Sequence, residues 1–296
     1  YFPNSEWLFQ SYSQRLMLTP IRQAKGEIAP EERLRRIHRL SSLKAKIGEN
    51  DSMVVWFSPA IEKVGKDEPI PDCSLEYFPL DIARNEYEAF QIVVSPKGTL
   101  SSLKINFSDG KTKDGYTLPA DQFKAFEVGF VPIKVVSDYY GDLKEYPDPI
   151  TPIKDVINIS EEGNIVIWAR LYVGKGQPPG IYEGKIQIIS VGLNVEVPYK
   201  VQVFNYVLPP YTSTETAYGV SPDYSWHGPL NEEQQREVFD LYMKTCMEYR
   251  ISPYTPHAFA PIKWTFEGTP PQAVLDFTEF DKAMEKYLNQ YNFNAF

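Results

Sequence analysis

Short β-rich runs separated by turn-forming residues dominate the chain from residue 53 to residue 204. The runs read MVVWF, AFQIVVS, LKINFS and NIVIWARLYV, and glycine, proline, aspartate and asparagine residues interrupt them. Long stretches of helical periodicity do not occur between these runs. Strands at this density, without crossover helices to join them, are typical of an antiparallel β-sandwich.

The clearest strand pattern lies in residues 182–204. Ile186 and Ile188 alternate with polar residues before Gly192, and Val195 and Val197 do the same after it. Strict alternation indicates strands with one buried face, and a glycine allows the tight turn between them. We therefore predict a hairpin in this part of the sandwich.

Residues 1 to about 50 are predicted to be a separate helical segment that Gly48 ends. Its apolar residues recur at helical spacing: Leu34, Ile37, Leu40, Leu43 and Ile47. Its basic residues fall mainly off this stripe: Arg33, Arg35, Arg36, Arg39, Lys44 and Lys46. Such a helix can touch a membrane or an acidic partner, although more often its basic face is simply solvated while the apolar face packs.

The pattern changes to alternating strands and helices after the stiff Leu-Pro-Pro linker at 208–210. Residues 215–220 and 250–257 are predicted strands, and 294–296 look like the start of a third. Asn231 is expected to cap the first helix, with Gln234 three residues on. The predicted buried face of that helix consists of Val238, Tyr242, Cys246 and Tyr249. For the second helix we expect Thr278 as the N-cap, Asp281 at the capping-box position, and Phe280, Met284, Leu288 and Tyr291 facing inward.

This alternation predicts the opening of a (β/α)8 barrel. A complete barrel needs about 250 residues, whereas fewer than 90 follow the linker. The predicted organisation is therefore mainly β, with a helical segment at 1–50, a β-sandwich at 51–212 and an incomplete (β/α) barrel at 213–296. The barrel part runs from about the first strand to the start of the third.

Charge and composition exclude several classes of function. The net charge is −9, and this acidic balance argues against a nucleic acid as partner, because its phosphates need an excess of basic residues to neutralise them. No apolar run approaches the roughly 20 residues of a membrane span. The two cysteines, Cys73 and Cys246, do not make a disulfide framework, and a bridge between them is possible but not expected. Phosphate-binding-loop and nucleophile-elbow motifs do not occur in the sequence. No cofactor is predicted.

Four segments of the chain carry a family resemblance. Residues 80–94, LDIARNEYEAFQIVV, resemble a signature of the N-terminal sandwich of glycoside hydrolase family 123-like proteins. Residues 146–152 resemble the same family's Pro-Asp-Pro motif, and 167–173 followed by 179–184 resemble its strand-turn-strand motif. The Leu-Pro-Pro exit at 208–210 also agrees, so the resemblance covers roughly residues 53–296 in family order.

Read as physical chemistry, these motifs first suggest structural roles. Arg84 is expected to pair with Glu86 or Glu88. Gln91 lies on an otherwise apolar strand and must find a hydrogen-bond partner if it is buried. Asp148 is expected to cap a proline-fixed turn.

The resemblance implies hydrolysis of β-linked N-acetylgalactosamine with help from the acetamido group of the substrate. The family places an adjacent Asp–Glu pair at the end of the fourth barrel strand for this chemistry. Adjacent acidic residues occur in this chain at 31–32, 67–68, 161–162 and 232–233, and none follows an apolar strand in the barrel segment. We therefore assign no catalytic residue here and expect the pair downstream of Phe296. The resemblance also implies a glycan or glycoconjugate as partner and a secreted, periplasmic or cell-surface location.

The barrel segment is expected to supply loop residues that face the substrate, because barrel sites form at the carboxyl ends of the strands. Six residues are predicted to bind the sugar: Asp223, Tyr224, Trp226, His227, Tyr254 and His257. They are equally well explained by loop packing against neighbouring prolines. A metal site from His227 and His257 is not favoured, since no third ligand has a telling spacing.

Whether the chain belongs to an active enzyme is left open by these observations. One alternative is a glycan-binding or structural sandwich without hydrolysis. Another is a family member whose barrel has lost its acids. The sequence that follows Phe296 distinguishes these readings from the glycosidase.

Overall fold

The computed structural model describes residues 44–135, 143–159 and 162–295. Most of the predicted N-terminal helix falls in residues 1–43 and lies outside the described residues. The chain divides into two compact units, Tyr1–Val207 and Leu208–Phe296. Each unit is described by itself, and the predicted limits of 50 and 212 stay predictions.

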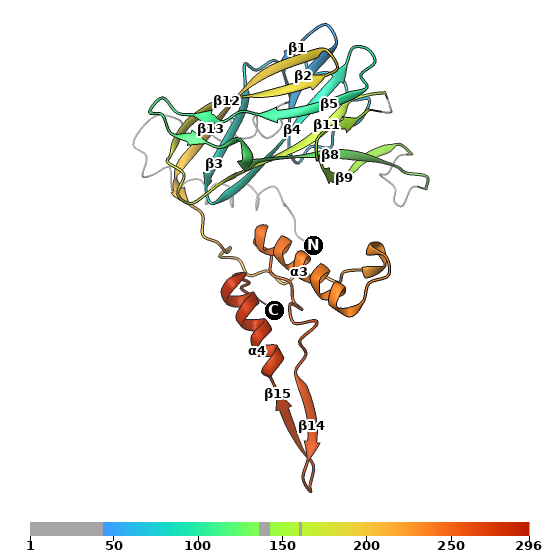
Figure 1. The fold of residues 1–296 in the computed structure, drawn as a ribbon, viewed down its shortest axis with the longest axis vertical. Helices are drawn as coiled ribbons and strands as arrows, with labels where there is room; N and C mark the ends of the chain where they lie inside the picture. Colours follow the sequence, from blue (N-terminus) through green and yellow to red (C-terminus); the bar gives the residue numbers. More distant parts are fainter. Residues whose placement is uncertain (1–43, 136–142, 160–161, 296) are drawn as a thin grey trace, which may run out of the picture. The chain divides into compact units, whose positions relative to one another are not determined.

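The first unit consists of two sheets facing each other (Figure 1). The first sheet has the order β1-β2-β4-β11-β8-β9. Its strands are β1 (Ala45–Glu49), β2 (Met53–Pro59), β4 (Glu86–Pro96), β11 (Ile165–Val173), β8 (Phe123–Pro132) and β9 (Glu145–Pro152). The short helix η1 (Ala120–Gln122) leads into β8.

The second sheet has the order β10-β5-β12-β13-β3, with two short strands attached to β12. Its strands are β10 (Ile157–Asn158), β5 (Ser102–Phe107), β12 (Gly180–Ser190), β13 (Leu193–Val207), β3 (Phe78–Arg84), β6 (Gly110–Lys111) and β7 (Thr117–Leu118). The β13–β3 pair is parallel, whereas the other strand pairs of the two sheets are antiparallel. The predicted antiparallel, mainly β architecture is confirmed.

The predicted hairpin is the β12–β13 pair. Its register runs from Gly180 opposite Val203 to Ser190 opposite Leu193, and Gly192 turns the chain with φ 72°. Ile186 and Val197 are 0% and 1% exposed, so the alternating apolar residues face the core as their spacing indicates.

The core fills the space between the two sheets. Phe78 lies between Phe57 and Phe90, with ring centroids 5.9 Å and 5.6 Å away, in the tilted geometry that aromatic pairs prefer. The outer face of the first sheet is also buried around β2 and its neighbour β4. Trp56 is 0% exposed, and its indole Nε1 donates to Ser95 Oγ at 2.8 Å. Burial on both faces explains why β2 is a continuous apolar run instead of an alternating one.

Two predictions in the first unit are wrong. Residues 45–49 form strand β1 and not the end of a helix, because pairing with β2 satisfies their backbone groups. Residues 145–152 form β9 and not a capped turn at Asp148. β9 is an edge strand of its sheet, which is where a sheet tolerates the missing N–H groups of prolines.

The buried amide of Gln91 finds the partners that the sequence requires. Its Nε2 donates to the carbonyl oxygens of Pro59 and Glu62, both at 2.7 Å. Arg84 does not form the predicted ion pair with Glu86 or Glu88 among the described residues. Its Nη2 reaches Asn205 Oδ1 at 3.4 Å, because the Glu86 carboxylate instead accepts the backbone N–H of Ala83 at 2.5 Å.

The second unit contains two helical stretches and a hairpin (Figure 1). In chain order its elements are η2 (Tyr224–His227), α3 (Glu232–Glu248), β14 (Lys263–Glu267), β15 (Gln272–Asp276), α4 (Thr278–Met284) and the π-helical η3 (Glu285–Gln290). Asn231 caps α3 as predicted, and Gln234 completes the capping box. None of the helices in the described ranges is long and apolar enough to cross a membrane.

The helix details of this unit differ from the prediction. The side chains that α3 buries are Phe239 and Met243, one position on from the predicted Val238 and Tyr242, because its sequence offers two adjoining apolar stripes. Thr278 does not cap α4. Instead, Asp276 Oδ1 accepts the Thr278 backbone N–H at 2.9 Å.

The inward face of α4 and η3 agrees with expectation. Met284 and Tyr291 are buried, and Phe280 and Leu288 pack against the same cluster. The predicted strands are much shorter than expected. Segments 215–220 and 250–257 contribute one parallel bridge, Tyr218 to Pro253, and residues 294–295 form no strand. Prolines at 253 and 256 remove the donors that a longer ladder needs.

Candidate functional site

Three segments that the sequence places in successive barrel strands lie side by side in the second unit. Tyr218 N–H donates to the Ser252 carbonyl at 2.9 Å, and Tyr254 N–H donates to the Tyr218 carbonyl at 3.0 Å. These two bonds have the pattern of a parallel pair.

Asn294 joins the third segment to the other two. Its Nδ2 donates to the carbonyl oxygens of Thr212 at 3.0 Å and Thr214 at 3.3 Å. Its backbone N–H donates to Ser252 Oγ at 2.9 Å, and Ser252 Oγ donates in turn to Asn294 Oδ1 at 2.9 Å. Asn294 therefore ties the third segment to Ser252 of the second segment and to Thr212 and Thr214, just before the first.

Four of the six predicted residues belong to η2 and its cap. Asp223 caps the short helix, and its Oδ1 accepts the backbone N–H of Ser225 at 3.0 Å and the Ser225 hydroxyl at 2.6 Å. These bonds hold the pKa of Asp223 below its ordinary value. The carboxylate of Asp223 therefore serves to cap this turn. Trp226 is 85% exposed, which leaves its indole ring available to a ligand.

Tyr224 and His227 gather around α3. The Nε2 atom of His227 lies 3.5 Å from the Tyr242 hydroxyl, with the rings edge to face. Tyr224 packs against Phe259, with centroids 6.2 Å apart. Burial, and then proximity to Tyr242, raises the pKa of Tyr224, so its hydroxyl stays protonated and can donate at neutral pH.

Tyr254 and His257 lie on the next loop. Tyr254 is 48% exposed and covers Gly219, where a Cβ atom would come within 3.0 Å of its ring. His257 packs edge to face on Phe280 at 5.2 Å. Its Nδ1 atom is buried and has no hydrogen-bond partner in the described part of the chain. Neither residue stacks on or hydrogen-bonds to η2 there, so the six predicted residues form two groups.

Metal ligands do not gather in this region. Over residues 44–135, 143–159 and 162–295, no group of three or more His, Cys, Asp or Glu side chains is placed to hold a metal ion. Both Cys73 and Cys246 are free thiols.

The prediction missed a pair of exposed aromatic residues on the β14–β15 hairpin. Trp264 and Phe266 are 63% and 65% exposed, with ring centroids 5.5 Å apart. The register pairs Trp264 with Leu275, so these apolar side chains share one face of the ribbon. The sequence KWTFE at 263–267 alternates aromatic and polar residues, and this alternation indicates a strand with both aromatic side chains on one face. The hairpin lies in the same connection as Tyr254 and His257, between the Tyr218–Pro253 bridge and α4.

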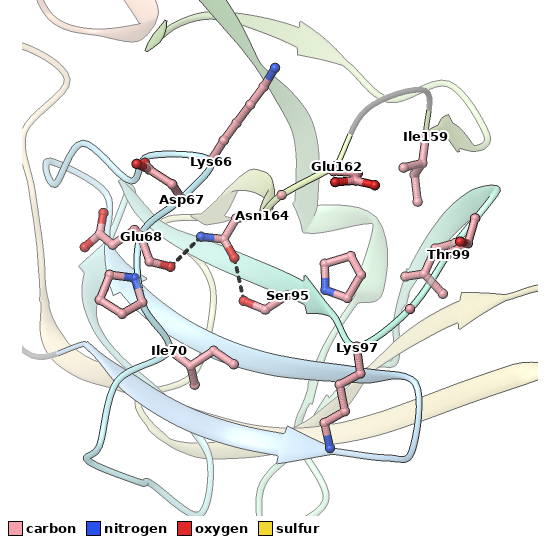
Figure 2. A pocket seen from close by; sticks show the side chains of 15 residues that line it. Lys66, Asp67, Glu68, Ile70, Ser95, Lys97, Thr99, Ile159, Glu162 and Asn164 are labelled. Atoms are coloured by element: carbon pink, nitrogen blue, oxygen red, sulfur yellow. Dashed lines mark hydrogen bonds between the residues drawn. The ribbon is translucent and has the colours of Figure 1, made fainter. Parts of the chain in front are cut away.

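A separate hollow of about 700 Å³ lies on the first unit (Figure 2). At its floor, Ser95 Oγ donates to Asn164 Oδ1 at 2.5 Å, and Asn164 Nδ2 donates to the carbonyl oxygens of Gly65 and Glu68 at 3.0 Å and 2.8 Å. The side-chain NH2 group of Asn164 therefore already donates two hydrogen bonds within the protein. None of the described residues that line the hollow is aromatic, so these residues offer no ring on which a sugar could stack.

Comparison with known proteins identifies the class of the sandwich. Residues 80–190 match the family model of the glycoside hydrolase 123 N-terminal domain. This range runs from β3 to the end of β12 and includes the 80–94 and 179–184 motifs. This part of the sandwich therefore resembles the N-terminal domain of glycoside hydrolase family 123. No curated protein sequence matches it.

Among solved structures, a family 123 glycoside hydrolase from Clostridium perfringens, studied for glycolipid glycan hydrolysis, resembles the chain with a TM-score of 0.60 and 16% identity. The match covers 81% of this chain and 46% of that one, so the chain spans about half of that enzyme's length. At this identity the likeness shows a shared fold. Because the first unit ends at Val207 of 296 residues, coverage of 81% must include part of the second unit.

Two fimbrial or pilus subunits match parts of the chain with low TM-scores. Self-complemented MyfA from Yersinia enterocolitica is 13% identical, with 44% of this chain and 93% of that chain covered and a TM-score of 0.27. The CooA pilin subunit from enterotoxigenic Escherichia coli is 14% identical, with 47% and 95% covered and a TM-score of 0.27. TM-scores this low carry no functional argument.

Proposed function

We propose that this chain is the N-terminal portion of a glycan hydrolase that removes β-linked N-acetylgalactosamine. The sandwich is its accessory domain, and the second unit begins its catalytic (β/α) barrel. The observation that carries the proposal is the combination of the family-model match at 80–190 with a fold likeness that extends past the sandwich. The parallel bridge at Tyr218 and the ties from Asn294 support the barrel assignment.

The proposed reaction uses the substrate's acetamido group as the nucleophile. Its oxygen attacks the anomeric carbon, so the protein supplies no carboxylate nucleophile, as in other substrate-assisted glycosidases. The protein must instead supply an acid that protonates the leaving oxygen and a second carboxylate that orients the acetamide. We place both on an adjacent Asp–Glu pair beyond Phe296.

The part of the site that this chain contributes is the rim made by the loops after the first two strands. Trp226 and Tyr254 expose aromatic faces, and the aromatic face of the β14–β15 hairpin belongs to the same loop as Tyr254. Flat apolar rings suit the C–H faces of a pyranose. The Tyr224 hydroxyl and the His227 ring, on the same short helix as Trp226, supply hydrogen-bonding groups. As a class of substrate we propose glycolipid glycans, which also favours a secreted, periplasmic or cell-surface location.

Binding of an oligosaccharide that ends in β-N-acetylgalactosamine tests the rim. We expect the chain to bind it weakly and Trp226→Ala to weaken binding about fivefold or more, because stacking contributes on the order of 1 kcal/mol. The matched control is Tyr116→Ala, which removes a 51% exposed aromatic residue of the sandwich. Equal affinity for the wild type and Trp226→Ala, with a loss in Tyr116→Ala, would move the glycan to the sandwich and favour the binding-module alternative.

A further inference from the structure

The β14–β15 hairpin is an amphipathic ribbon. Its register pairs Trp264 with Leu275 and Phe266 with Ala273, so strand alternation places these four apolar side chains on one face. The opposite face carries Lys263, Thr265, Glu267, Gln272, Val274 and Asp276. One face of the ribbon is therefore apolar and aromatic, and the other is mainly polar.

The apolar face is not covered by any other described part of the chain. Every residue of β14 and β15 is exposed, and the ribbon projects from the helices of its own unit (Figure 1). Trp264, Phe266 and Leu275 are 63%, 65% and 52% exposed. A two-stranded hairpin is only marginally stable in water by itself, and an exposed group of large apolar side chains indicates a binding surface.

The backbone of the ribbon limits how deeply it can enter an apolar environment. Within the described ranges, β14 and β15 pair only with each other, so the outer edge of each strand keeps N–H and C=O groups that need water. Open strand edges are not tolerated in the hydrocarbon interior of a bilayer. They stay hydrated at the level of the lipid head groups, where tryptophan side chains are enriched. The ribbon therefore suits the surface of a bilayer and not a membrane span.

The charges around the ribbon complement zwitterionic head groups. Lys263 lies opposite Asp276 in the register, and Lys282 of α4 pairs with Glu279 at 2.8 Å. Glu267 is the remaining ionisable residue of the two strands. Both signs of charge are thus presented together, which matches the phosphate and the choline group of a phosphatidylcholine. An anionic lipid gains nothing from this arrangement, because the ribbon has no excess of basic residues.

The ribbon belongs to the same connection as the rim residue Tyr254. The sugar of a glycolipid is displayed at the surface of the bilayer that holds its lipid, so a rim that binds this sugar must reach that surface. We propose that the apolar face of the β14–β15 hairpin rests on the surface of a zwitterionic lipid bilayer. Trp226 and Tyr254 then remain free to bind the sugar. The inference rests on the proposed function for its substrate, a glycolipid glycan, whereas the bilayer contact is measurable without any glycan.

Co-sedimentation of the full chain with vesicles of phosphatidylcholine alone tests the contact. We expect the wild type to bind these vesicles, and Trp264→Thr with Phe266→Thr to lower the partition coefficient at least about tenfold, because two large apolar side chains are lost. Threonine keeps the strand preference of the ribbon. Trp264→Leu with Phe266→Leu keeps the face apolar and should retain binding. The matched control, Val274→Thr, changes the opposite face and should bind as the wild type does.

Lipid composition and a soluble sugar separate this inference from the proposed function. Adding phosphatidylserine to the vesicles should not tighten binding, and salt should not release the protein. Binding of a soluble oligosaccharide that ends in β-N-acetylgalactosamine is measured in parallel. Oligosaccharide binding without vesicle binding would overturn the bilayer contact and leave the proposed function standing. Vesicle binding without oligosaccharide binding would support the contact and count against the proposed function.

Other occupants of the apolar face give different results. Equal vesicle binding by the wild type and by the double threonine variant would overturn the proposal. So would a dimer in solution that the same two substitutions dissociate, because a second copy of the chain would then cover the face. Loss of vesicle binding in a polypeptide that continues past Phe296 would also overturn it, since the downstream residues would then occupy the ribbon.

Discussion

Glu88 carries a carboxyl group that lies against an apolar groove and beside two other acidic side chains. The folded-state pKa of about 7, caused first by burial, exceeds the ordinary 4.5. Below pH 4.5 the group is protonated in both states and costs nothing. Between pH 4.5 and 7 the unfolded chain ionises while the folded chain keeps its proton, so stability falls as pH rises, and above pH 7 the full cost is present.

Replacing Glu88 by glutamine removes that cost. We expect Glu88→Gln to raise the free energy of unfolding at pH 8 by about 1–2 kcal/mol after solvent screening, and to leave it nearly unchanged at pH 4.5. Urea denaturation at both pH values measures this. Glu196→Gln is the control, because a hydrogen bond from Lys185 holds the pKa of Glu196 below its ordinary value, so it should gain nothing at pH 8. A gain by Glu88→Gln at pH 4.5 equal to that at pH 8 would contradict the account.

Gly184 shows a second residue-scale constraint. It pairs with Tyr199 across β12 and β13, and a Cβ atom at this position would lie 2.3 Å from the Tyr199 ring. We expect Gly184→Ala to destabilise the fold by about 2–3 kcal/mol through overpacking. Gly174→Ala, where a Cβ meets nothing within 4 Å, should change stability by less than about 0.5 kcal/mol. Urea unfolding of the two variants measures both free energies of unfolding. An equal decrease in the two variants would show that Tyr199 moves aside.

At the residue scale the sequence predicts what a local pattern encodes. The burial of Ile186 and the need of Gln91 for a partner both follow from strand alternation. The Asn164 network does not, because its partners Ser95 and Glu68 are separated from it by 69 and 96 residues. Which polar side chains meet across a sandwich depends on tertiary pairing, which no local spacing records.

At the scale of elements, the start of α3 tests a helix cap that the sequence predicts. Asn231 Oδ1 accepts the Gln234 backbone N–H at 2.9 Å, and Gln234 Oε1 accepts the Asn231 N–H at 3.0 Å. We expect Asn231→Ala to cost about 1 kcal/mol, measured as faster amide exchange in the first turn of α3. Asn231→Asp keeps an acceptor and should cost almost nothing. Similar exchange in all three proteins would mean that packing alone fixes the helix start.

The element predictions that failed have a common cause. Residues 45–49 continue a helical spacing, yet they form a strand because β2 offers an unpaired edge. The predicted strands at 215–220 and 250–257 shrink to one bridge because prolines limit the ladder. The α3 face was assigned one position away because Phe239 and Val238 are both apolar. In each case tertiary partners decided between local options of similar strength.

At the scale of the whole molecule, the sandwich was predictable because its strands are many, short and punctuated by turns. The arrangement of the candidate site is harder to predict from the sequence. The six predicted residues separate into a group around Tyr242 and a group around Gly219 and Phe280, and the exposed aromatic pair of the hairpin was missed. Loop residues lack the periodicity that marks strands, so their neighbours follow only from the fold.

We propose that this chain is the scaffold and one rim of a glycan hydrolase whose catalytic acids lie beyond Phe296. The most direct measurement is hydrolysis of a chromogenic β-N-acetylgalactosaminide by this chain and by a polypeptide that continues past Phe296. The account predicts no turnover by residues 1–296. It predicts turnover by the longer protein, lost when an adjacent Asp–Glu pair at the end of the fourth barrel strand is replaced by Asn and Gln. Turnover by residues 1–296, abolished by a substitution within them, or a longer protein with neither the pair nor activity, would contradict it.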